Sequence, residues 1–323
     1  MNIRALIRNG AVGLLILGGC DTPFEPKGSY REKLVVYAVL TTRADTQYVR
    51  VYTTYNPTGF DPLEVGAETP VRNAQVSLTT ESITHRLRDT TIFRIDKSRY
   101  STELAAYVAY PLAINQGSRY SLAVVSPLGN VSAATSVPGK GSVLLANAYV
   151  MKEPEKFNED IYIYLTLSPL SRGFMIRWYI DFEIRSGGAW SPQRLEVPAS
   201  IETSGPNKDQ FIYPALTRRS SETTARQTME TFGFARPAYR LFLKGLKSKY
   251  AAFEFRFKRA VFILTQVDVN LYNYYNIVSG FQDKFSIRTD LPDYSNIQGG
   301  LGLFGAMGED TLLVDLPEEI EIP

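Results

Sequence analysis

The run Phe174-Met175-Ile176-Arg177-Trp178-Tyr179-Ile180-Asp181-Phe182-Glu183-Ile184-Arg185 indicates the fold class. Every second residue is apolar, and most of the residues between are charged or polar, so an extended strand would present one apolar and one wet face. Residues 161–167 and 253–257 repeat this alternation in the same half of the chain. The pattern predicts an antiparallel sheet that buries a single face.

The first half of the chain contains short runs of β-forming residues separated by Gly, Pro, Asn and Asp. These runs are residues 34–40, 48–52, 74–78, 92–95, 120–125 and 131–137. Short strands at such intervals are typical of a β-sandwich of about a hundred residues. Pro127-Leu128-Gly129-Asn130 has turn chemistry, and it predicts a hairpin between the last two runs.

Pro138-Gly139-Lys140-Gly141 combines a strand-ending proline with two glycines and is the predicted domain boundary. We therefore expect a mainly β protein. An immunoglobulin-like β-sandwich over residues 33–139 would be followed by an α+β domain over residues 142–323, with an antiparallel sheet and one or two helices.

Helical spacing of apolar residues predicts helices over residues 220–232 and from Asp268 onwards. Residues 186–215 and 233–248 mix glycine, proline and charge, and they are expected to form surface loops.

Cys20 ends the run Leu17-Gly18-Gly19-Cys20, which follows two arginines and a short apolar stretch, residues 11–17. That stretch is too short to cross a bilayer, and the arrangement is typical of an export signal with a cleavage site. The run resembles a lipobox, so residues 1–19 are a predicted lipoprotein signal peptide. Cys20 would then carry acyl chains, each buried methylene of which contributes about 0.8 kcal/mol to membrane binding.

An ordinary secretory signal with an incidental cysteine, or a free buried thiol, is the alternative for Cys20. The chain has one cysteine, so an internal disulfide is excluded. Residues 20–32 contain two prolines and mixed charge without an apolar period, and we expect them to form a lipidated tether.

Charge argues against a nucleic-acid partner. Cleavage before Cys20 removes Arg4 and Arg8, which leaves as many basic as acidic residues. A nucleic-acid binder would normally carry a basic domain or stripe.

The segments at 272–276 and 293–305 are distinctive. They read Tyr272-Asn273-Tyr274-Tyr275-Asn276 and Asp293-Tyr294-Ser295-Asn296-Ile297-Gln298-Gly299-Gly300-Leu301-Gly302-Leu303-Phe304-Gly305. Together with the lipobox, a leading strand at 33–36 and the element at 71–76, they resemble a Bacteroidota lipoprotein family catalogued as domain of unknown function 4249. The resemblance implies an outer-membrane lipoprotein, often regarded as an accessory to TonB-dependent uptake receptors, without assigned catalytic residues.

Catalytic and cofactor motifs find little support. Gly300–Gly305 has the G-x-G-x-x-G spacing of a dinucleotide loop, but 18 residues follow it and no βαβ unit fits. A tight turn or a closely packed strand is the expected reason for these glycines. His85 is the only histidine and is expected on an exposed strand. The sequence therefore has no Cys or His zinc cluster and at most one serine–histidine arrangement, for which no G-x-S-x-G elbow exists. No cofactor or metal is expected.

We therefore expect a non-enzymatic outer-membrane lipoprotein that binds an uptake receptor or its ligand, on an undetermined membrane face. Its candidate contact residues are Tyr272, Tyr275, Tyr294 and Phe304, because exposed aromatics dominate many interfaces. Packing within the second domain is the alternative role for each of them. The alternative functions are a surface glycan hydrolase that uses two carboxylates, and a structural envelope protein.

Overall fold

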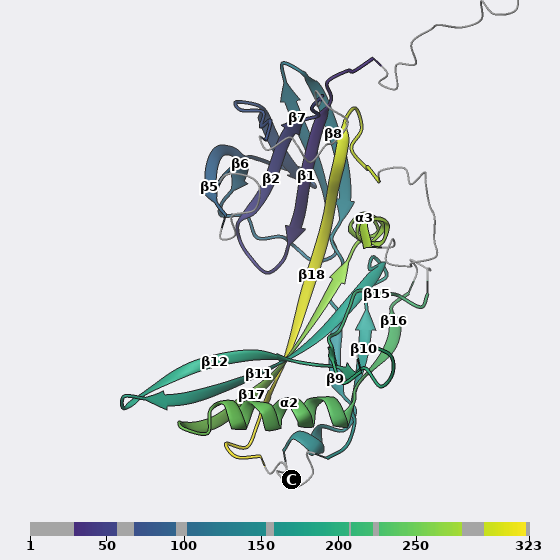
Figure 1. Ribbon diagram of the computed structural model, residues 1–323. Coiled ribbons are helices and arrows are strands. Elements are labelled where there is room, and N and C mark those ends of the chain that lie inside the picture. The colour runs from purple at the N-terminus through teal and green to yellow at the C-terminus, as the bar shows by residue number, and fades with distance from the viewer. Residues whose placement is uncertain are drawn as a thin grey trace, which may run out of the picture. The chain divides into compact units, whose positions relative to one another are not determined.

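The structure is a computed structural model that describes residues 29–56, 68–94, 102–152, 158–206, 208–221, 226–279 and 294–320. The predicted signal peptide and Cys20 lie outside the described residues. The described chain is mainly β, with several antiparallel sheets and two α-helices (Figure 1). The predicted mainly β fold with antiparallel sheets and one or two helices is confirmed.

Two sheets enclose one hydrophobic core in the first part of the chain. One contains β1 (Leu34–Thr41), β2 (Gln47–Thr53), β6 (Glu103–Ala109) and β5 (Arg88–Phe93), and the other contains β4 (Ile83–Arg86), β3 (Gln75–Thr80), β7 (Arg119–Ser126) and β8 (Gly129–Ser136). Val36, Leu78 and Leu122 come from the two sheets and are buried in the same core. The predicted hairpin is confirmed, since β7 and β8 pair from Ser126 and Gly129 outwards.

A second core forms around Trp178 in the later part of the chain. It lies under β11 (Gly173–Ser186), β12 (Ala189–Val197) and β17 (Glu254–Val267), with β9 (Ser142–Leu145), β10 (Ile161–Leu167), β16 (Thr228–Phe234) and helix α2 (Arg236–Lys249) around it. The Trp178 ring stacks on Phe262 with centroids 5.5 Å apart, and Tyr239 of α2 lies 5.6 Å away. Burying each large apolar side chain of this kind contributes about 1.5–3 kcal/mol.

Four short elements complete this part. They are the 3-10 helix η2 (Ala148–Met151), and the two-residue strands β13 (Ser200–Ile201), β14 (Phe211–Ile212) and β15 (Thr217–Arg218).

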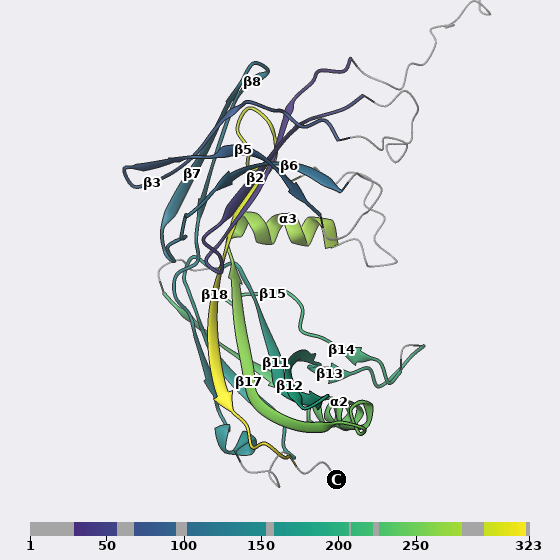
Figure 2. The same ribbon diagram turned by 90° about the vertical axis from the view of Figure 1, so that its left-hand side faces the viewer.

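Strand β18 (Leu301–Asp315) belongs to both parts of the chain. Its first half pairs in parallel with β1, from Val35 opposite Leu301 to Thr41 opposite Met307. Its second half pairs antiparallel with β17, ending at Arg259 opposite Asp315. One nine-stranded sheet therefore runs through β12, β11, β17, β18, β1, β2, β6 and β5, with β15 beside β11. Figures 1 and 2 both show β18 alongside β1 and β17. The predicted domain boundary near residues 138–142 stays a prediction. Strand β18 completes the sheet on both sides of this boundary, because it pairs with β1 and with β17.

The glycine-rich segment forms part of strand β18 and packs closely against β1. The prediction that these glycines belong to a closely packed strand is therefore confirmed. Gly302 has a φ of +116°, and a Cβ added there would lie 2.0 Å from the Val36 carbonyl oxygen. Just before it, the Asn296 side chain binds both backbone groups of Phe304. Asn296 Oδ1 accepts from the Phe304 N–H at 2.9 Å, and Asn296 Nδ2 donates to the Phe304 carbonyl at 2.8 Å. These bonds hold residue 296 beside β18, and Gln298 pairs with Ser132 of the sandwich strand β8 through two backbone hydrogen bonds.

The helix predicted from Asp268 is confirmed as α3 (Val269–Ser279), which packs on β18. The helix predicted over residues 220–232 is wrong, because Thr228–Phe234 forms β16 and pairs with β10. Pairing with a neighbouring strand overrides the local helical spacing there.

The loops predicted over residues 186–215 and 233–248 are wrong in part. β12 occupies Ala189–Val197, where Pro192 is tolerated because β12 is the edge strand of the sheet. α2 occupies Arg236–Lys249, with Pro237 in its first turn, where its missing N–H costs nothing. No helix in the described part of the chain is both long and apolar enough to cross a membrane.

Candidate functional site

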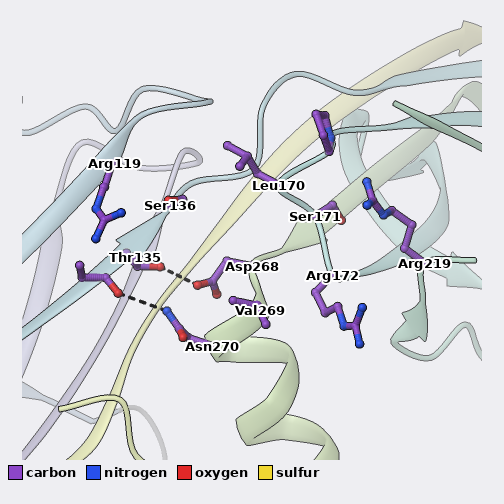
Figure 3. A pocket seen from close by; sticks show the side chains of 12 residues that line it. Arg119, Thr135, Ser136, Leu170, Ser171, Arg172, Arg219, Asp268, Val269 and Asn270 are labelled. Carbon is purple, nitrogen blue, oxygen red and sulfur yellow. Dashed lines mark hydrogen bonds between the residues drawn. The ribbon is translucent and has the colours of Figure 1, made fainter. Parts of the chain in front are cut away.

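Asp268 links three elements where β17 ends and α3 begins. It is 2% exposed, and its carboxylate accepts three hydrogen bonds. Oδ1 accepts from the Leu271 N–H at 2.9 Å and the Ala306 N–H at 3.1 Å, and Oδ2 accepts from the Thr135 hydroxyl at 2.6 Å. The carboxylate therefore caps α3 and ties it to β18 and to the sandwich strand β8 (Figure 3).

Burial raises the pKa of the Asp268 carboxyl above its ordinary value, because a buried charge loses its hydration. The hydrogen bonds from Thr135, Leu271 and Ala306 act in the opposite direction and lower the pKa, but burial is the larger cause. The site thus contains a carboxylate that binds a proton more readily than an exposed aspartate.

A cavity of about 400 Å³ opens beside Asp268, between β8 and the loop from β10 to β11. Its lining consists of Arg119, residues 134–136, residues 169–172, Arg219 and residues 268–270. We call it the junction cavity. Figure 3 shows Arg119 on one side of Asp268, with Arg172 and Arg219 on the other.

Three arginines give the junction cavity a positive character. Arg219 is 3% exposed and is held by backbone carbonyls, since its Nε donates to Ser221 at 2.7 Å and its NH1 donates to Ser168 at 2.8 Å. Burial, and then the positive charge of Arg172, lower the pKa of Arg219. Arg119 is exposed on β7. An anionic group in the cavity would offset the repulsion between neighbouring guanidinium groups and could accept paired hydrogen bonds from them.

The cavity lining combines cations, hydroxyl groups and one carboxylate. Within the described ranges, no group of three or more His, Cys, Asp or Glu residues could hold a metal ion. His85 lies half-buried on β4 as a strand residue and does not line the junction cavity. Among these groups, the Asp268 carboxylate accepts a hydrogen bond from the Thr135 hydroxyl at 2.6 Å.

Two of the four sequence-predicted contact residues lie beside this cavity. The Tyr272 ring lies directly on Gly173, where an added Cβ would be 2.4 Å from Tyr272 Cδ2. The Tyr294 hydroxyl donates to Asn270 Oδ1 at 2.8 Å, and Asn270 is part of the cavity lining. Burial is the main cause that raises the pKa of the Tyr294 hydroxyl, and the nearby negative charge of Asp268 raises it further. Both tyrosines are half-buried and support the cavity wall.

The other two predicted contact residues differ sharply in exposure. Tyr275 is 50% exposed on α3 and stays a candidate contact residue. Phe304 was expected among the exposed aromatics, and this expectation is wrong, since Phe304 is 0% exposed in the sandwich core. β18 places Phe304 on the core face of the sheet, so its role is packing.

Sequence reasoning missed the arginines of the junction cavity. Arg119 lies on β7, Arg172 directly before β11 and Arg219 directly after β15. They are about fifty residues apart in the chain, and no local spacing links them. Asp268 carried a weak signal, because an aspartate directly before a helical pattern is a common cap.

Comparison with families of known sequence gives one match. A family model described as a domain of unknown function (DUF4249) matches residues 21–312. No curated protein matches the chain.

Proposed function

The chain belongs to the domain of unknown function 4249 family, and from that premise we propose that it is a lipid-anchored, non-enzymatic binding component of the outer membrane. The predicted anchor is Cys20, and the proposed partner is a TonB-dependent uptake receptor. The family match supplies neither a reaction nor a ligand, so the proposal depends on the sequence and on the chemistry of the site.

The observation that carries the proposal is the positive junction cavity. A buried arginine, a second arginine close enough to lower its pKa and an exposed third arginine surround a space of about 400 Å³. Charge-assisted hydrogen bonds from arginine to a carboxylate or phosphate are among the stronger polar contacts in proteins. We infer that an acidic group of the receptor enters this cavity.

The anchor gives this binding site its location. Several acyl chains on Cys20 would hold the protein at a membrane surface, where the receptor is also confined. Confinement raises the effective concentration of the two proteins for each other, so a modest contact at the cavity would suffice.

A pull-down from the native envelope tests the proposal. The tagged full chain is solubilised in mild detergent and its partners are identified by mass spectrometry, beside Cys20→Ala and Arg119→Glu variants. Arg88→Glu on the edge strand β5 is the matched control, because Arg88 is an exposed arginine that does not line the cavity.

We expect a large outer-membrane receptor with the wild type and with Arg88→Glu. It should be lost with Cys20→Ala and reduced about tenfold with Arg119→Glu, which replaces a favourable charge contact by repulsion. Recovery of the lipoprotein alone from wild-type envelopes would contradict the proposal. In that case cleavage of a glycan by the isolated protein would support the hydrolase alternative, and inactivity would support a structural role.

A further inference from the structure

The small sheet of β9, β10 and β16 carries aromatic residues on its solvent face. Tyr162 and Tyr164 alternate with buried residues along β10 and are 47% and 44% exposed. Their Cα atoms lie about 7 Å apart along the strand, and residues two apart share a face. The solvent face of an antiparallel sheet is usually polar, so two adjacent exposed rings are unusual there.

These rings form part of a concave surface. The space beside them measures about 760 Å³ and is bordered by η2, β10, β16 and the start of α2. Tyr149 of η2 adds a third aromatic side chain, 47% exposed. We call this the tyrosine groove, formed by Asn147, Tyr149, residues 158–160, Tyr162, Tyr164 and Arg236. Its volume lies within the range of about 300–1,000 Å³ that is typical of small-ligand sites.

The rim of the groove is polar and firmly held. Asp160 Oδ1 accepts from the Arg236 backbone N–H at 2.7 Å, and Asp160 Oδ2 lies 3.4 Å from the Tyr162 hydroxyl. Glu159 Oε2 accepts from the Tyr149 hydroxyl at 2.8 Å. Each carboxylate retains further acceptor positions, because an ionised carboxylate can accept about four hydrogen bonds.

Asn147 fixes the same rim from the other side. Its Nδ2 donates to the Asp160 carbonyl at 2.8 Å, and its Oδ1 accepts from the Tyr162 N–H at 3.2 Å. With Arg236 present beside the two carboxylates, the rim holds charges of both signs. The groove therefore has no strong preference for an anionic or a cationic ligand.

We propose that the tyrosine groove binds a neutral oligosaccharide. Sugar rings present a face of C–H groups that packs on the electron-rich face of an aromatic ring, and they carry hydroxyl groups around their edge. Tyr162 and Tyr164 place two aromatic rings on the same exposed face of β10. The carboxylates, the asparagines and Arg236 supply acceptors and donors for the hydroxyl groups. This inference rests on the groove alone and is independent of the junction cavity.

Affinity electrophoresis of the detergent-solubilised full chain tests the proposal. The protein migrates through native gels containing laminarin, xylan, dextran or mannan, and its retardation is compared with that in a gel without polysaccharide. A Tyr162→Ala/Tyr164→Ala variant removes both rings. Tyr48→Ala is the matched control, since Tyr48 is a 45% exposed tyrosine on β2 of a different sheet. Tyr164→Phe keeps the ring and removes only the hydroxyl.

We expect at least one polysaccharide to retard the wild type, Tyr48→Ala and Tyr164→Phe. The double variant should bind it about tenfold more weakly, with an unchanged circular dichroism spectrum. Retardation by none of the four polysaccharides would overturn the proposal, and so would equal retardation of the folded double variant. Loss of a protein partner from the double variant, without any change in polysaccharide binding, would instead identify the groove as a protein interface.

Discussion

Replacing Asp268 by alanine tests whether one carboxylate holds the junction between the sandwich and the second core. The side chain accepts hydrogen bonds from Thr135, Leu271 and Ala306, which belong to β8, α3 and β18. Alanine leaves all three donors without this acceptor. The junction cavity borders the same residues, so its shape depends on these contacts.

The expected cost follows from the individual contacts. Loss of the cap at the start of α3 costs about 1 kcal/mol. The Ala306 N–H is fully buried, and leaving such a donor unsatisfied costs about 1–3 kcal/mol. Relief from burying a carboxylate offsets part of this sum, so we expect Asp268→Ala to lower the free energy of unfolding by about 2 kcal/mol.

Asp268→Asn separates the hydrogen bonds from the charge. Its amide oxygen can accept from Leu271 and Ala306, and its amide nitrogen can donate to the Thr135 hydroxyl. Burial raises the pKa of Asp268 in the folded protein. The stability that this group contributes is therefore fully present below its ordinary pKa and is lost as the pH rises through the folded value. The asparagine variant should cost about 1 kcal/mol at acid pH and less at neutral pH.

Urea unfolding followed by circular dichroism, at several pH values above the ordinary pKa of 3.8, measures both effects. Wild type, Asp268→Ala and Asp268→Asn are compared at each pH. A cost below about 1 kcal/mol for the alanine variant would refute the role of Asp268 as the link between the three elements. A cost of Asp268→Asn that grows with rising pH would refute the raised pKa.

Three further outcomes are expected. Gly302→Ala should lower the free energy of unfolding by about 2–4 kcal/mol, because residue 302 has a positive φ and its new Cβ would meet the Val36 carbonyl. Gly245→Ala is the control in the same denaturation assay, because Gly245 lies on the exposed side of α2 with open space around it. Burial raises the pKa of Tyr239 to about 12. The stability that its hydroxyl contributes is therefore present below pH 10 and is lost as the pH rises towards 12. Tyr239→Phe should remove one late step from an absorbance titration at alkaline pH. Cys20→Ala should abolish incorporation of labelled palmitate and release the protein from the membrane fraction, whereas a labelled variant protein would contradict the anchor.

The strands could be predicted from sequence because their signal is local. The alternation of apolar and polar residues along Phe174–Arg185 indicates which face of the strand is buried, and this does not depend on which strands pair with it. The double membership of β18 could not be predicted. Its partners β1 and β17 lie far away in sequence, and an alternating pattern does not specify which strands pair.

The candidate site was even less accessible to sequence reasoning. Asp268 was recognised only as the start of a helix, while Arg119, Arg172 and Arg219 come together through tertiary structure alone. Phe304 was misjudged for a related reason. The glycines around it predicted a tight turn or a closely packed strand but did not indicate which face Phe304 occupies, and the pairing of β18 with β1 places this residue in the core. The α2 helix was missed because Pro237 and Gly245 masked the buried stripe of its other residues.

The most direct test of the account is site-specific photo-crosslinking in intact cells. A benzoyl-phenylalanine placed at Leu170 lies in the wall of the junction cavity. The same probe at Leu128 is the control, because Leu128 is 53% exposed at the turn of the β7–β8 hairpin, about 23 Å along the strands from Arg119. We predict a crosslink between position 170 and a large outer-membrane receptor, and none from position 128. No crosslink from position 170, or equal crosslinking from both positions, would contradict the claim that the receptor binds at the junction cavity.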